Sequence, residues 1–151
     1  MSAPLTNSIQ QVVETVWSTL LGLDVQRLPA PPASGVDDAW AGTVRISGAW
    51  DGEVRVQCSS ELAHRAAAIM FALDRTAISA AQAEDALREL ANVTGGNLME
   101  VLPGPCELSM PSVWSGSTVP RQPGSLMLSR VFFDCEGEPL AVVIIRTASA
   151  S

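Results

Sequence analysis

The chain has few of the side chains that carry metal-ion or nucleophilic catalysis. It contains one histidine and three cysteines, and Cys58, Cys106 and Cys135 lie far apart in the sequence. A single histidine does not make a metal site, no Ser or Cys nucleophile motif surrounds His64, and the cysteine spacing fits neither a zinc site nor a disulfide framework. We therefore expect three small buried thiols and a His64 that lies at the surface or caps a helix.

Basic residues and long apolar runs are also scarce. Nine Lys and Arg residues stand against sixteen Asp and Glu residues, which gives a formal net charge of -7. Such a chain repels nucleic acid and anionic membranes. No apolar run approaches the roughly 18 residues that cross a bilayer, and the first residues lack the order of a secretory signal. These features predict a cytoplasmic protein without a nucleic-acid or membrane partner.

The chain does have enough apolar side chains for a core. Hydrophobic residues make up 47% of the sequence, and its length suits one domain. Periodicity and turn signals predict three helices, two hairpins and a single strand. These elements are helices over 6–22, 59–73 and 79–102, hairpins over 40–58 and 126–147, and a strand over 106–113.

This order of elements predicts an α+β fold of two layers. A mostly antiparallel sheet would be packed by one long helix, over 79–102, and by two further helices. We expect a single domain over residues 1–147, followed by a disordered tail over 148–151.

Local sequence features place the strands within that sheet. Asp51-Gly52 is expected to supply the positive φ of the first hairpin turn. Pro111 restricts its strand to an edge or to its end. Residues 141–145, AVVII, are apolar on both faces, which predicts a central strand.

The long helix carries an unusual polar face. On the side expected to face the core, an apolar stripe recurs at helical spacing. Its members are Leu87, Leu90, Ala91, Thr94, Leu98 and Val101. Asp85, Glu89, Asn92 and Gly96 gather on the opposite side. Asn and Gly each cost a helix roughly 0.5–1 kcal/mol relative to Ala, so this face does not serve helix stability and is the candidate site.

Asp85, Glu89 and Asn92 stand one above another on that face. A carboxylate and a carboxamide three residues apart have Cβ atoms about 5–6 Å from each other. That spacing allows one group to hold a partner while the other positions a water molecule. Exposed Asp, Glu and Asn are most often only solvated. The face by itself is therefore compatible with a functional site and with an ordinary solvated helix surface.

The wider segment resembles the CheX/CheC group of chemotaxis phosphatases. The resemblance is carried by DALRELANVTGGNL followed by LSMPSV. The helix of that group carries Asp or Ser, three residues, Glu, two residues and Asn, with a Gly-Asn pair one turn further on and a proline in the next strand. The matching positions here are Asp85, Glu89, Asn92, Gly96, Asn97 and Pro111.

The resemblance covers most of the chain, including the first helix, the first hairpin, the short helix and the closing strands. At Met99 the chain departs from the group, which often has a basic residue there. One Glu-x-x-Asn element is visible in the sequence, as in the single-site CheX type.

The resemblance implies a CheC-like fold and hydrolysis of the phospho-aspartate of a CheY-type response regulator. Asn92 would orient the attacking water, and Glu89 would pair with a lysine of the regulator. The residues expected to contact the partner are Asp85, Gly96, Asn97 and Met99. The chain would have no cofactor of its own, because the regulator would bring Mg²⁺. Proteins of the CheX type pair through their sheets, so we also expect a homodimer.

Two other functions fit the same pattern. A CheX-like module would dock a signalling partner without hydrolysing anything, and a structural domain would serve dimerisation alone. Asn92 distinguishes a phosphatase from a docking module, because hydrolysis requires its side chain and docking does not.

Overall fold

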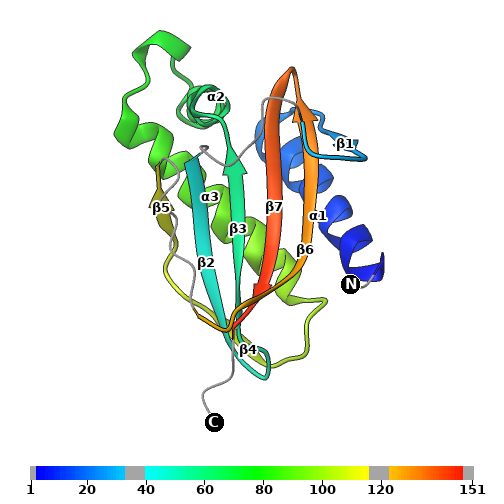
Figure 1. The fold of residues 1–151 in the computed structure, drawn as a ribbon. Coiled ribbons are helices and arrows are strands. Elements are labelled where there is room, and N and C mark those ends of the chain that lie inside the picture. Colours follow the sequence, from blue (N-terminus) through cyan, green and yellow to red (C-terminus); the bar gives the residue numbers. More distant parts are fainter. Residues whose placement is uncertain (1–2, 33–39, 116–122, 148–151) are drawn as a thin grey trace.

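A computed structural model of the chain describes residues 3–32, 40–115 and 123–147 (Figure 1). The predicted disordered tail, 148–151, lies outside these residues. Within them, three α-helices lie on one face of a seven-stranded antiparallel sheet. The predicted two-layer α+β architecture is therefore confirmed.

The helices are α1 (Ala3–Leu21), α2 (Ser60–Phe71) and α3 (Ala80–Met99), with a short 3-10 helix at Arg75–Ala77. The strands are β1 (Gln26–Leu28), β2 (Trp40–Gly48), β3 (Gly52–Cys58), β4 (Cys106–Leu108), β5 (Ser112–Trp114), β6 (Leu126–Cys135) and β7 (Glu138–Arg146).

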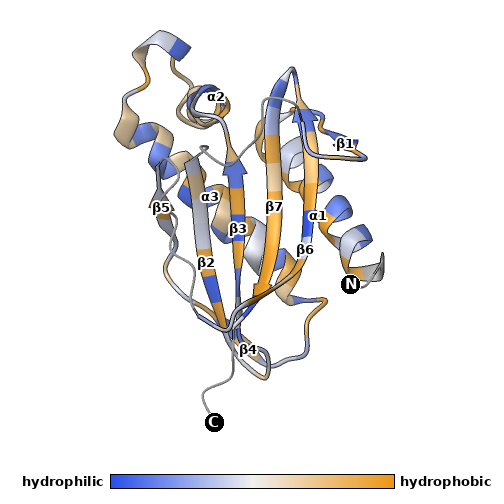
Figure 2. Cartoon of the chain, in the orientation of Figure 1, coloured by the Kyte–Doolittle hydropathy of each residue, from blue (hydrophilic) through white to orange (hydrophobic). Residues whose placement is uncertain are grey.

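The sheet is built around the strand that the sequence predicts to be central. The strand order is β1-β6-β7-β3-β2-β4, and β5 also pairs with β2. β7 therefore lies between β6 and β3, and all five of its residues 141–145 are buried. Figure 2 shows that β7 is apolar along most of its length.

The core lies between the helices and the sheet. On α1, Ile9, Val13 and Trp17 are completely buried. Val56 on β3 and Phe133 on β6 are buried with them in the same apolar cluster. Side chains at every second position of a strand share one face, so the helix-facing side of the sheet is mostly apolar; on β6 it also carries Ser129, whose Oγ lies 2.9 Å from Thr6 Oγ1 on α1.

Side chains cap the N-termini of α2 and of α3, the helix that contains the candidate site. Ser59 Oγ accepts a hydrogen bond from Leu62 N (3.1 Å) at the start of α2. At the start of α3, Ser79 Oγ accepts from Gln82 N (3.1 Å), and Gln82 Oε1 accepts from Ser79 N (2.9 Å). This reciprocal capping box satisfies two backbone donors and fixes where α3 begins.

The end of α3 differs from the sequence prediction. The helix stops at Met99, three residues before the predicted end at residue 102. Val101, predicted to belong to the apolar stripe, is instead 52% exposed. The physical reason is that Pro103 and Pro105 cannot continue a helix, and the chain turns before reaching them.

The first hairpin turn also differs from its prediction. Gly52 does not have a positive φ; Gly48 does, at 130°. Asp51 Oδ1 accepts a hydrogen bond from Gly48 N (3.3 Å) within the turn. Gly52 is required for a different reason, because a Cβ atom there would overlap the buried indole ring of Trp50.

The three cysteines are free thiols in unequal environments. Cys58 and Cys135 are completely buried, as predicted, whereas Cys106 is only partly buried. Burial raises the pKa of Cys58 to about 12 and that of Cys135 to about 11. Cys106 Sγ donates a hydrogen bond to Pro103 O (3.1 Å) at the surface.

We expect Ellman's reagent at pH 8 to label one thiol rapidly in the native protein and all three in denaturant. The thiolate is the reacting species, and both burial and a raised pKa suppress it at Cys58 and Cys135. A Cys106→Ser variant should lose the rapid phase. Rapid labelling of a second native thiol would contradict the burial described above.

Candidate functional site

The buried side of α3 is the predicted apolar stripe, without Val101. The buried residues of the helix are Ala83, Ala86, Leu87, Leu90, Ala91, Thr94, Gly95 and Leu98. Asp85 and Glu89 are exposed on the opposite side, and Asn92 is partly exposed. The predicted polar face therefore points away from the core.

Two glycines set the position of α3 against the sheet. A Cβ atom added at Gly95 would lie 2.5 Å from Val44 Cγ2 on β2, and one added at Gly42 would lie 2.7 Å from Leu87 O on α3. Both distances are shorter than real Cβ contacts allow. The helix and β2 are therefore in close contact, and this contact decides which residues of α3 face outward.

The polar face of α3 forms one wall of a surface groove of about 450 Å³. The other wall is formed by residues 108–111, which begin at the last residue of β4 and lead into β5. The groove is lined by Asp85, Arg88, Glu89, Asn92, Leu108, Ser109, Met110 and Pro111. The structure thus brings Pro111 beside the predicted acidic and amide residues.

Pro111 takes the edge position that its chemistry predicts. It lies in the gap between β4 and β5, and within the described ranges both of these short strands pair only with β2. Because the ladder with β2 is interrupted at Met110 and Pro111, the missing N–H of proline leaves no sheet hydrogen bond unmade.

The acidic and amide groups of the groove differ in their contacts. Asp85 Oδ1 accepts a hydrogen bond from Arg88 Nη1 (2.6 Å), and Arg88 Nη2 lies 3.7 Å from Glu84 Oε2. Among the described residues, the side chains of Glu89 and Asn92 make no hydrogen bond or ion pair. Glu89 and Asn92 therefore present a carboxylate and a carboxamide to whatever enters the groove.

The other residues predicted to contact a partner lie outside the groove lining. Gly96 is partly exposed, and a Cβ atom there would meet nothing within 4 Å. Asn97 is exposed, but its Nδ2 donates to Val93 O one turn earlier (2.8 Å). Met99 is half-buried and packs against the core. Their contact with a partner stays a prediction.

Sequence reasoning missed half of the groove. Arg88 was detectable in principle, because it stands three residues after Asp85 on a helix, where opposite charges meet. Leu108, Ser109 and Met110 had no such signal. Their place beside α3 depends on the pairing of β4 with β2, which is a long-range contact.

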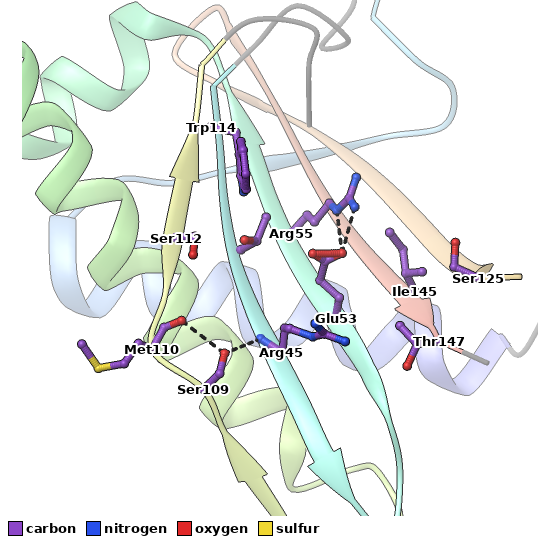
Figure 3. A pocket seen from close by; sticks show the side chains of 11 residues that line it. Arg45, Glu53, Arg55, Ser109, Met110, Ser112, Trp114, Ser125, Ile145 and Thr147 are labelled. Atoms are coloured by element: carbon purple, nitrogen blue, oxygen red, sulfur yellow. Dashed lines mark hydrogen bonds and ion pairs between the residues drawn. The ribbon is translucent and has the colours of Figure 1, made fainter. Parts of the chain in front are cut away.

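A second pocket, of about 380 Å³, lies on the sheet face opposite the helices (Figure 3). Its charged groups belong to adjacent strands, and Arg55, which is 7% exposed, pairs with Glu53 (Nη2 to Oε2, 2.8 Å). None of the predicted site residues lines it. It shares Ser109 and Met110 with the groove on α3, so this segment separates the two hollows.

The one histidine of the chain, His64, packs against a neighbouring ring and against its own helix. His64 lies on α2, with its ring centroid 5.6 Å from that of Trp40 and its Nδ1 2.7 Å from Ser60 O. In the part of the chain that the structure describes, no three His, Cys, Asp or Glu side chains are grouped to hold a metal ion. No helix in that part is both long and apolar enough to span a membrane.

Solved structures share this fold across almost the whole chain. A chemotaxis protein CheX from Vibrio vulnificus is 18% identical, with a TM-score of 0.77 over 94% of this chain and 95% of its own. A CheC-like superfamily protein from a Shewanella species is 15% identical, with a TM-score of 0.74 over 98% of this chain and 100% of its own. No curated protein sequence matches the chain.

A third similar structure is a CheX-CheY-BeF3-Mg²⁺ complex from Borrelia burgdorferi. The matched chain of that complex is 16% identical to this one, with a TM-score of 0.70 over 93% of this chain and 97% of its own. These likenesses define the fold as that of the CheC-like proteins. The family described as chemotaxis phosphatase CheX matches residues 40–133, which is more than half of the sequence. The chain belongs to the CheX family.

The two adjacent glycines of α3 should respond in opposite ways to the same substitution. Gly95→Ala should lower the free energy of unfolding by about 1–3 kcal/mol, because the new methyl group has to displace Val44. Gly96→Ala should raise it by about 0.5–1 kcal/mol, because alanine favours a helix and the space is open. Urea denaturation of both variants measures these changes, and equal changes would contradict the close contact between α3 and β2.

Proposed function

We propose that this chain hydrolyses the phospho-aspartate of a CheY-type response regulator. The observation that carries the proposal is the groove on α3, where Glu89 and Asn92 face outward without partners among the described residues and beside Pro111. Membership of a family of chemotaxis phosphatases supports it, as does the Borrelia burgdorferi complex of a similarly folded CheX with CheY.

Asn92 orients the attacking water in this proposal. An acyl phosphate is already activated, so its hydrolysis needs an in-line water more than a strong base. The carboxamide both accepts and donates hydrogen bonds, which suits it to fix the orientation of that water. Its partly exposed position at the groove wall leaves room for a partner to deliver the phosphoryl group.

Glu89 holds the partner in register in this proposal. A carboxylate one helical turn from Asn92 can pair with a lysine near the phosphorylated aspartate of the regulator. An ion pair in open water contributes little, but docking excludes water from the groove and strengthens the charge-assisted hydrogen bond. The pairing then couples correct docking to correct placement of Asn92.

The regulator supplies the rest of the site. Its Mg²⁺, when bound, neutralises charge on the phosphoryl oxygens. Asp85, Gly96, Asn97 and Met99 contact the partner along α3, and the open space over Gly96 allows another backbone to approach closely. The two protein surfaces together would form a complete site, of which this chain contributes half.

The direct test is phosphate release from a purified CheY-type regulator of the same genome, phosphorylated with acetyl phosphate. We expect Asn92→Ala to lower the maximal rate by about 100-fold, the loss typical of a removed orienting group. Glu89→Ala should mainly raise the half-saturating concentration of regulator, by about tenfold. Matched controls are Asn7→Ala and Glu14→Ala, exposed on α1, which should behave as the wild type.

The outcomes separate the proposed functions. If wild type does not accelerate phosphate release but binds the regulator, the chain is a docking module and the hydrolytic proposal is wrong. If wild type and Asn92→Ala hydrolyse equally fast, the role of Asn92 is wrong. The predicted homodimer is tested separately by light scattering of the purified chain, since a monomer at micromolar concentration would contradict it.

A further inference from the structure

Met110 is the most exposed large apolar side chain in the part of the chain that the structure describes. It is 86% exposed, followed by Leu126 at 61% and Val101 at 52%. A single exposed apolar residue is ordinary on a protein surface, so exposure alone does not mark a site. Met110 differs from the other two because it lines the groove that contains Glu89 and Asn92.

Backbone hydrogen bonds hold the segment that carries Met110. Ser109 N donates to Arg45 O (2.9 Å), and Arg45 N donates to Ser109 Oγ (2.9 Å). Ser109 Oγ in turn donates to Met110 O (3.2 Å). Pro111 fixes its own φ, and the strands on both sides, β4 and β5, pair with β2. The backbone at Met110 is therefore already ordered, which lowers the entropy that a partner has to remove on binding.

The side chain of Met110 serves no internal packing role that the structure shows. In Figure 3 it points away from Arg45, Glu53 and Arg55, although the residue borders the pocket on the sheet face as well as the groove. Beside it, Leu108 is partly buried and packs against the core. The wall opposite α3 is therefore apolar except at Ser109, and Met110 is its most exposed apolar side chain.

An exposed methionine suits the contact surface of a partner. Methionine is unbranched and polarizable, so it adapts to the shape of an apolar recess, and it is enriched at the centres of protein interfaces. Opposite it, α3 supplies charged and amide groups that fix orientation. The groove thus combines one apolar side chain with polar groups beside it, as protein interfaces combine an apolar centre with a polar rim.

We infer that Met110 is the apolar anchor by which this groove holds the regulator. The inference rests on the proposed function, and its occupant is an apolar recess on the CheY-type regulator beside the phosphorylated aspartate. Met110 sets how tightly a regulator binds and which regulator is accepted, while Glu89 and Asn92 act on the docked phosphoryl group. A regulator with a charged residue in the recess is rejected, because that charge is buried without a partner.

The test compares Met110→Ala, Met110→Leu and a matched control, Leu126→Ala, which removes an exposed apolar side chain outside the groove lining. Phosphate release is measured over a range of concentrations of the phosphorylated regulator. Met110→Ala should raise the half-saturating concentration about five- to tenfold, the effect of truncating an interface anchor, with a maximal rate unchanged within about twofold. Met110→Leu, which conserves volume, should raise that concentration less than Met110→Ala does, and Leu126→Ala should match the wild type.

A second measurement separates this inference from the hydrolytic proposal. Binding of the regulator loaded with beryllium fluoride and Mg²⁺ is measured by calorimetry, which needs no turnover. Weaker binding by Met110→Ala, with wild-type binding by Leu126→Ala, supports the anchor even if no phosphate is released. Equal binding by Met110→Ala and wild type overturns the anchor, whether or not the chain hydrolyses phospho-aspartate. A loss of maximal rate at unchanged half-saturation also overturns it.

Discussion

A direct contact between α3 and β2 determines the geometry of the candidate site. Gly95 on the helix and Gly42 on the strand each remove a side chain that would otherwise separate the two elements. The short separation fixes the rotation of α3 about its own axis, because the side of the helix that carries Gly95 has to face the sheet. Asp85, Glu89 and Asn92 then lie on the outer side, where no other element of the described chain makes a hydrogen bond or ion pair with the last two.

The same strand also holds the second wall of the groove. β4 and β5 both pair with β2, and Ser109 between them is bonded to the backbone of Arg45 on that strand. One strand therefore positions the polar groups of α3 on one side and residues 108–111 on the other. In our proposal, this arrangement is how a chain with few catalytic side chains contributes to hydrolysis. It offers oriented groups on a rigid surface, and in our proposal the reactive aspartyl phosphate and its Mg²⁺ come from the partner.

Much of the fold followed from local patterns in the sequence. The apolar stripe of α3 as far as Leu98 and the central position of residues 141–145 depend on simple periodicity along the chain, and the sequence predicts both. The features that were missed depend on long-range packing. A Cβ atom at Gly52 would overlap the backbone oxygen of Ile145 on β7, and Met110 lies beside α3 because of the pairing of β4 and β5 with β2. The resemblance pointed to Glu89, Asn92 and Pro111, whereas the place of Leu108, Ser109 and Met110 in the opposite wall became visible only in three dimensions.

The most direct test of the central claim is a crystal structure of this chain bound to a CheY-type regulator carrying beryllium fluoride and Mg²⁺. The decisive quantity is the distance from the carboxamide of Asn92 to the fluoride group or to the water in line with it. Our account predicts a separation of about 3 Å, that of a hydrogen bond, with Glu89 paired to a lysine of the regulator. A regulator docked on another surface, or an Asn92 side chain directed away from the fluoride group, would contradict the account.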